Sequence, residues 1–109
     1  MPDEIEREYQ KVLHESLEKM PEIIRSAIFE PKLSATDRLK WTEIAVRLTH
    51  PPVGRARTDL DRKNARECRR ILRQVVPYLV QIRDGHPSER LRMKADHWFK
   101  EITMKLGPQ

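Results

Sequence analysis

The sequence is poor in glycine and cysteine, with three glycines and one cysteine among 109 residues. It also lacks long runs of alternating β-branched residues. The scarcity of glycine and the absence of such runs both favour helices over sheets. A single cysteine, Cys68, cannot form a disulfide within the chain, so we expect a reducing compartment. No segment approaches the ~20 apolar residues that span a bilayer, and residues 1–10 lack a signal-peptide pattern. We therefore expect a cytoplasmic protein with no membrane partner.

Hydrophobic residues are also scarce, at 38% of the sequence, whereas charged residues make up 36%. A chain of this length supports one modest core and is too short for two. We expect a single helical domain, 1–109, in which each helix buries a narrow apolar stripe rather than its whole surface.

The charge is unevenly distributed along the chain. The overall charge is +5, but residues 1–20 carry −3, and residues 55–109 hold 14 lysines and arginines against 7 acidic residues. This asymmetry indicates an anionic partner for the second half of the chain. Alternatively, an acidic first helix lies beside the basic part and neutralises some of its charge.

Proline, glycine and capping residues divide the chain into expected helices. These helices are 3–18, 21–29, 35–48, 58–82 and 88–106. Ser34 and Asp37 resemble a capping box, and Pro21 suits a first helical turn. Pro77 lies inside the fourth helix, where it supplies no amide to an earlier carbonyl, so we expect a kink there. The fold class we predict is all-α, a bundle of four or five helices with a long, arginine-rich, proline-kinked fourth helix.

The fourth helix has two opposite faces of different chemistry. At about 100° per residue, one side holds Leu60, Cys68, Ile71 and Val75, and the other holds Arg62, Arg66, Arg69 and Arg73. The first side suits a core. The second forms a row about 16 Å long that suits anions.

We predict that this row binds a nucleic acid or an acidic partner. The candidate residues are Arg55, Arg57, Arg62, Lys63, Arg66, Arg69, Arg70 and Arg73. Arginine outnumbers lysine among them, and its planar fork binds phosphate with two hydrogen bonds. Only Asn64 and Gln74 on this helix could read bases, so recognition would follow the backbone with weak sequence specificity.

Two other interpretations of the basic helix stay open. The protein could be an interaction module, an adaptor or regulator that binds an acidic protein surface or self-associates into a homo-oligomer. The charged face could also serve only to keep the helix solvated. No zinc-binding spacing, aromatic RNA-binding motif or leucine heptad accompanies it. A helix-turn-helix could be placed on residues 22–49, but its second helix is only weakly basic.

Catalysis, metals and cofactors have little support in the sequence. The four histidines are scattered, and the nearest grouping of possible ligands, Asp96, His97 and Glu101, suits surface ion pairs better than a metal. Cys68 is phased toward the core, away from the role of a nucleophile. We expect no enzyme, metal or cofactor. Trp41 and Phe99, near the edges of their apolar stripes, are the better candidates for exposed aromatic contacts, and Trp98 is expected to be a core residue.

Overall fold

The computed structural model describes residues 4–7, 19–49 and 59–106. Residues 4–7 are helical, and the longer helices are α2 (Met20–Ile28), α3 (Ala35–Thr49), α4 (Asp59–Gly85) and α5 (Glu89–Leu106). None of the described residues belongs to a β-strand. The predicted all-α helical bundle is therefore confirmed.

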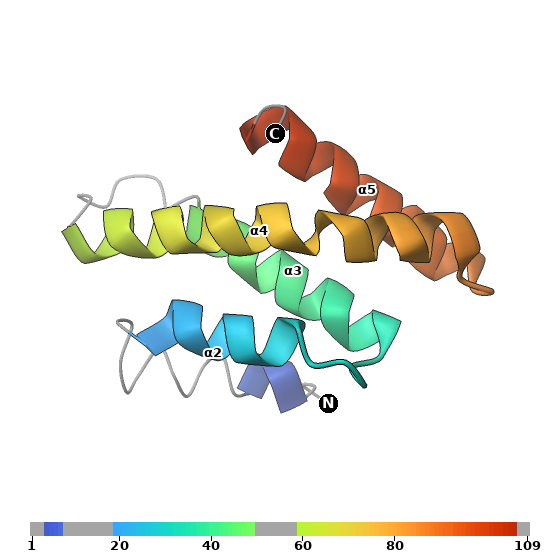
Figure 1. Ribbon diagram of the computed structural model, residues 1–109, viewed down its shortest axis with the longest axis horizontal. Helices are drawn as coiled ribbons and strands as arrows, with labels where there is room; N and C mark the ends of the chain where they lie inside the picture. The colour runs from blue at the N-terminus through green and yellow to red at the C-terminus, as the bar shows by residue number, and fades with distance from the viewer. Residues whose placement is uncertain (1–3, 8–18, 50–58, 107–109) are drawn as a thin grey trace.

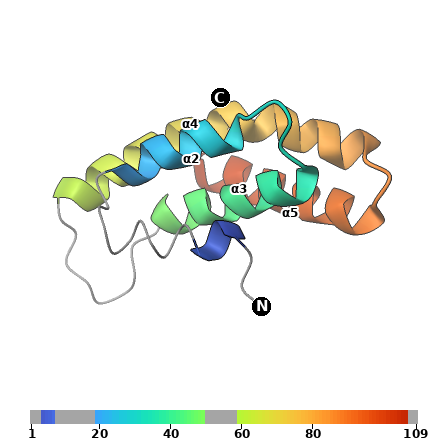
Figure 2. The same cartoon turned by 90° about the horizontal axis from the view of Figure 1, so that it is seen from below.

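The helices form two layers, which are seen edge-on in Figure 2. One layer contains α2 and α4, which run side by side, and the other contains α3 and α5 (Figures 1 and 2). α4 contacts each of the other three helices, and α3 does the same. These two helices therefore organise the bundle, and one face of α4 is covered by its neighbours.

Short polar caps start α3 and α5 close to the predicted positions. The Ser34 hydroxyl accepts a hydrogen bond from the Asp37 amide at 3.2 Å, and the Ser88 hydroxyl accepts one from the Leu91 amide at 3.3 Å. Each cap satisfies an amide that has no partner within its helix. Pro21 lies in the first turn of α2, where its missing amide costs nothing.

α4 continues through Pro77 as one helix. Figure 2 shows its axis changing direction part-way along its length, in the gold portion of the ribbon. Pro77 is exposed, so its ring lies on the solvent side of the bundle. The expectation of one bent helix, rather than two separate helices, agrees with this course.

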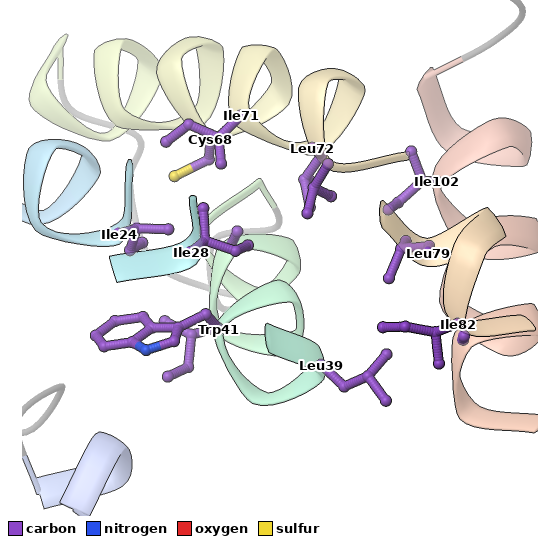
Figure 3. Close-up of a cluster of buried hydrophobic side chains, with 14 of the residues drawn as sticks. Ile24, Ile28, Leu39, Trp41, Cys68, Ile71, Leu72, Leu79, Ile82 and Ile102 are labelled. Carbon is purple, nitrogen blue, oxygen red and sulfur yellow. The ribbon is translucent and has the colours of Figure 1, made fainter. Parts of the chain in front are cut away.

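The core consists of side chains from all four helices (Figure 3). Its buried members are Met20, Ile24, Ile28, Leu39, Trp41, Ile44, Ala45, Cys68, Ile71, Leu72, Val75, Leu79, Ile82, Ala95 and Ile102. α4 contributes the largest share, on the face that its 3.6-residue period predicts. α5 contributes only two of them, so it is the helix least enclosed by the others.

Trp41 belongs to this core, and the expectation that it would be exposed is wrong. Its side chain is only 3% exposed, and it lies between α2 and α3 (Figure 3). The reason is that α3 packs against α2, α4 and α5, so it buries more than one stripe. A residue at the edge of the main stripe of α3 is then covered by a second neighbour.

Arg38 is a buried cation that ties three helices together. It is 9% exposed, and its Nε donates a hydrogen bond to the Ile28 carbonyl at 3.0 Å. Its Nη2 donates another to the Glu30 carbonyl at 2.8 Å. The guanidinium carbon also lies 4.6 Å from the centroid of the Tyr78 ring on α4. Arg38 therefore satisfies carbonyls at the end of α2 while it stacks on α4.

We expect Arg38→Ala to lower the free energy of unfolding by about 2–4 kcal/mol, because buried carbonyls lose charged donors and a ring loses its stacking partner. Urea denaturation followed by circular dichroism measures this change. Arg47→Ala is the matched control, since that half-exposed arginine pairs with Glu6 and Glu43 at the surface, and such pairs are worth about 0–1 kcal/mol. Equal losses in the two variants would contradict the structural role of Arg38.

Candidate functional site

The arginine row of α4 faces outward because the opposite side of the helix is buried. Cys68, Ile71 and Val75 are fully buried, whereas Arg66 and Arg73 are exposed. Of the other two members of the row, Arg62 is exposed and Arg69 is half-buried. The two-faced helix expected from the sequence is thus present in the fold.

Two of the candidate arginines, one in the row and one beside it, form weak ion pairs within α4. Arg62 Nη1 lies 3.3 Å from Asp59 Oδ1, and Arg70 Nη1 lies 3.5 Å from Glu67 Oε1. Both arginine side chains remain more than 60% exposed, at 62% and 68%, so solvent screens these pairs. An incoming anion can compete with such a surface carboxylate at little cost.

Three cations of the site have no ion pair with any described residue. They are Lys63, Arg66 and Arg69. Arg62, Arg66 and Arg69 also line a hollow of about 340 Å³, together with Asp59 and Ala65. This hollow gathers three guanidinium groups around a small side chain, so a negatively charged group placed there meets several donors at once.

The basic surface extends from α4 onto α2, which the sequence pattern did not indicate. Arg25 Nη2, on α2, lies 3.4 Å from Glu67 Oε2 of α4. The Glu67 carboxylate therefore pairs with both Arg25 and Arg70. Lys19, at the start of α2, lines the same groove as Arg25 and Lys63. In the sequence, Lys19 and Arg25 are isolated basic residues far from the arginines of α4. They join the α4 surface because α2 and α4 run side by side in the fold (Figure 1).

The described acidic residues of the opening segment do not neutralise the α4 row. Glu6 Oε2 lies 3.1 Å from Lys40 Nζ, and Glu6 Oε1 lies 3.4 Å from Arg47 Nη1, both on α3. Glu4 is exposed. Within residues 4–7, the acidic segment therefore balances α3 rather than the arginines of α4.

α3 is a poor candidate for the recognition helix of a helix-turn-helix. Its three basic residues are Arg38, which is buried, and Lys40 and Arg47, which both pair with Glu6 and Glu43. Their charges already serve the fold. α4, by contrast, carries Lys63, Arg66 and Arg69 with no ion pair to any described residue.

Arg55 and Arg57 lie outside the described residues, so the expected arm before α4 has no structural account. Of the two residues on α4 that could read bases, Asn64 is buried, at 4% exposed, and Gln74 is exposed. Asn64 is thus part of the interior, which leaves Gln74 as the one of these two residues that could reach a base.

Cys68 lies in the interior among Ile24 and Ile28 of α2 (Figure 3). Burial raises the pKa of its thiol from 9.0 to about 12, and the charge of Glu67 acts in the same direction. The thiol is therefore protonated at neutral pH, which is the opposite of what a nucleophile requires.

The acidic residues near His97 form ion pairs. Asp96 pairs with Lys100 at 2.9 Å, and Glu101 pairs with Lys105 at 3.1 Å. The His97 ring lies edge-on to Trp98, with 4.8 Å between ring centroids. Across the described ranges, no three His, Cys, Asp or Glu residues gather as a metal site would require.

No helix in the described part of the chain is both long and apolar enough to cross a membrane. Comparisons with protein-family models, with curated proteins and with solved structures found no match for this chain. The function is therefore argued from the residues of this protein alone.

We expect Glu6→Gln to lower the free energy of unfolding by about 0.2–1 kcal/mol at pH 7, because it weakens the pairs with Lys40 and Arg47. A hydrogen bond from Lys40 is the main cause that holds the pKa of Glu6 below its usual 4.5. Burial opposes this shift, and the charges of both cations reinforce it. The difference between wild type and variant should shrink as the pH falls from about 4.5 through the lowered pKa, because the native carboxylate then becomes protonated. Urea titrations at pH 7 and pH 3 measure both values, and a gap that widens in acid would contradict the pairing.

Native Cys68 should resist a thiol reagent at pH 8 and react only after unfolding, because it is fully buried.

The raised pKa of Cys68 also predicts how stability changes at alkaline pH. Between about pH 9 and 12 an unfolded thiol ionises while the native one does not, so this group costs up to about 1.4 kcal/mol of stability per pH unit. The stability gap between wild type and Cys68→Ala should therefore narrow over that range. Rapid labelling of the folded protein would disprove the assignment.

Proposed function

We propose that this protein is a small, non-catalytic, cytoplasmic subunit that binds the phosphate backbone of nucleic acids through the outward face of α4. The observation that supports this proposal is the row of exposed Arg62, Arg66 and Arg73 with half-buried Arg69 on the outward face of α4. Two of these four, Arg66 and Arg69, have no ion pair with any described residue. A helix that only needs solvation usually interleaves both signs of charge.

The dimensions of the row match a run of phosphates. Arg62 and Arg73 are eleven positions apart, which corresponds to about 16 Å along a helix. Duplex DNA carries one charge per ~1.7 Å of axis, so several phosphates lie within that distance. Each phosphate neutralised by an arginine releases counterions, and this release drives association at low salt.

Arg25 and Lys19 of α2 widen the row into a surface two helices across. Arg25 is held over α4 by Glu67, and its side chain is still 47% exposed. A strand that lies along α4 would therefore meet a second line of cations on its α2 side. Because Asn64 is buried, this contact favours backbone recognition over base recognition.

The test is binding of a labelled mixed-sequence duplex DNA and a single-stranded RNA of equal length. The double variant Arg66→Glu, Arg69→Glu should bind at least about tenfold more weakly at low salt, with unchanged circular dichroism. The slope of log affinity against log salt should also fall by about two, one for each lost phosphate contact. Comparing the two probes distinguishes DNA from RNA as the preferred backbone.

The matched control is Lys100→Glu, Lys105→Glu on α5, which changes the net charge by the same amount at exposed positions. This control should reduce affinity by less than about threefold, through the long-range field alone. Equal losses in the two double variants, or binding that does not depend on salt, would overturn the proposal.

A further inference from the structure

A groove is lined by residues of α3 and α5. These two helices form the layer that does not contain α4 (Figure 2). Its volume is about 550 Å³. It is lined by Thr36, Asp37, Leu39, Lys40, Glu43, Arg90, Leu91, Met93, Lys94, His97 and Trp98. The nucleic-acid proposal uses none of these residues.

The floor of this groove is apolar and continuous with the core. Leu39 is 3% exposed, and Leu91 and Trp98 are half-buried side chains packed against the core cluster. Met93, on the α5 wall, is 66% exposed and one of two large hydrophobic residues that the described surface leaves open to solvent. Met93, Leu91 and Trp98 therefore give the α5 side of the groove apolar surface that another side chain can contact.

The charges around the groove leave a net positive rim. Lys40 and Glu43 pair with each other at 3.4 Å, and each has a further partner, Glu6 or Arg47. On the α5 wall, Arg90 and Lys94 have no ion pair among the described residues. Asp37 is the one groove carboxylate outside these pairs. Available cations therefore outnumber available anions.

We propose that this groove docks an acidic amphipathic helix of another protein. The inference goes beyond the nucleic-acid proposal and does not depend on it. Apolar side chains of the partner would lie on Leu39, Leu91 and Trp98, and its carboxylates would pair with Arg90 and Lys94.

The spacing of the groove residues suits a helix. Leu91 and Trp98 are seven positions apart on α5, about 10.5 Å, which equals the distance between residues i and i+7 of a partner helix. Arg90 and Lys94 are one turn apart, so they can meet carboxylates on successive turns of the partner.

The two tryptophans provide a direct readout. The sequence has two, and Trp41 is 3% exposed in the core, so a change in solvent exposure on binding is reported by Trp98. The probe is a helical peptide with leucines at i, i+3 and i+7 and glutamates elsewhere. It should produce a saturable change in tryptophan fluorescence and protect Trp98 from iodide quenching. The same peptide with lysines in place of glutamates should do neither.

Lys94→Glu should weaken peptide binding about tenfold, because it replaces an attraction in the groove by a repulsion. Lys100→Glu is the matched control, since Lys100 is an exposed lysine of the same helix outside the groove, with a side chain 69% exposed. It should change affinity by less than about twofold. Met93→Asp should weaken binding by about tenfold as well, without loss of helicity.

Equal binding of the lysine peptide, equal effects of Lys94→Glu and Lys100→Glu, or absence of a saturable signal would overturn this proposal. Protection of Trp98 by a nucleic-acid probe, but not by the acidic peptide, would do so too. Nucleic-acid binding measured on the same variants separates the two proposals, since Lys94→Glu and Lys100→Glu should affect it equally and weakly.

Discussion

The structure depends on Arg38, a buried guanidinium that joins α2, α3 and α4. It donates hydrogen bonds to the carbonyls of Ile28 and Glu30 at the end of α2 and stacks on Tyr78 of α4. Burying a charge is costly unless it is fully hydrogen-bonded, so these contacts constrain where α2 ends relative to α4. This arrangement places Arg25 beside Glu67 and so extends the basic surface over two helices.

The two layers present different chemistry to solvent. On the α2–α4 layer most of the exposed charged residues are arginines, and exposed Arg66 and half-buried Arg69 have no ion pair with any described residue. On the α3–α5 layer most carboxylates and lysines pair with each other, and an apolar groove runs between the helices. A phosphate backbone suits the first surface, and an acidic amphipathic helix suits the second.

Much of the architecture could be predicted from local patterns. Ser34 and Pro21 mark helix starts because capping and proline chemistry act within one turn. The phase of Cys68 and Ile71 against Arg66 predicted which face of α4 is buried, since a helix repeats every 3.6 residues. The prediction that Trp41 is exposed was wrong, because the hydrophobic pattern of α3 does not reveal how many other helices pack against it.

The sequence by itself determined the helical class, the approximate bounds of α2, α3, α4 and α5, and the two-faced character of α4, because each follows from residues within a few turns of one another. Most of the expected first helix, 3–18, lies outside the described residues. Only the tertiary structure decided that Arg38 is interior, that Glu6 pairs with Lys40 rather than with α4, and that Arg25 joins the basic surface. Each of these depends on which helices pack side by side. That choice is made by the combined burial of all apolar stripes, which no single segment specifies.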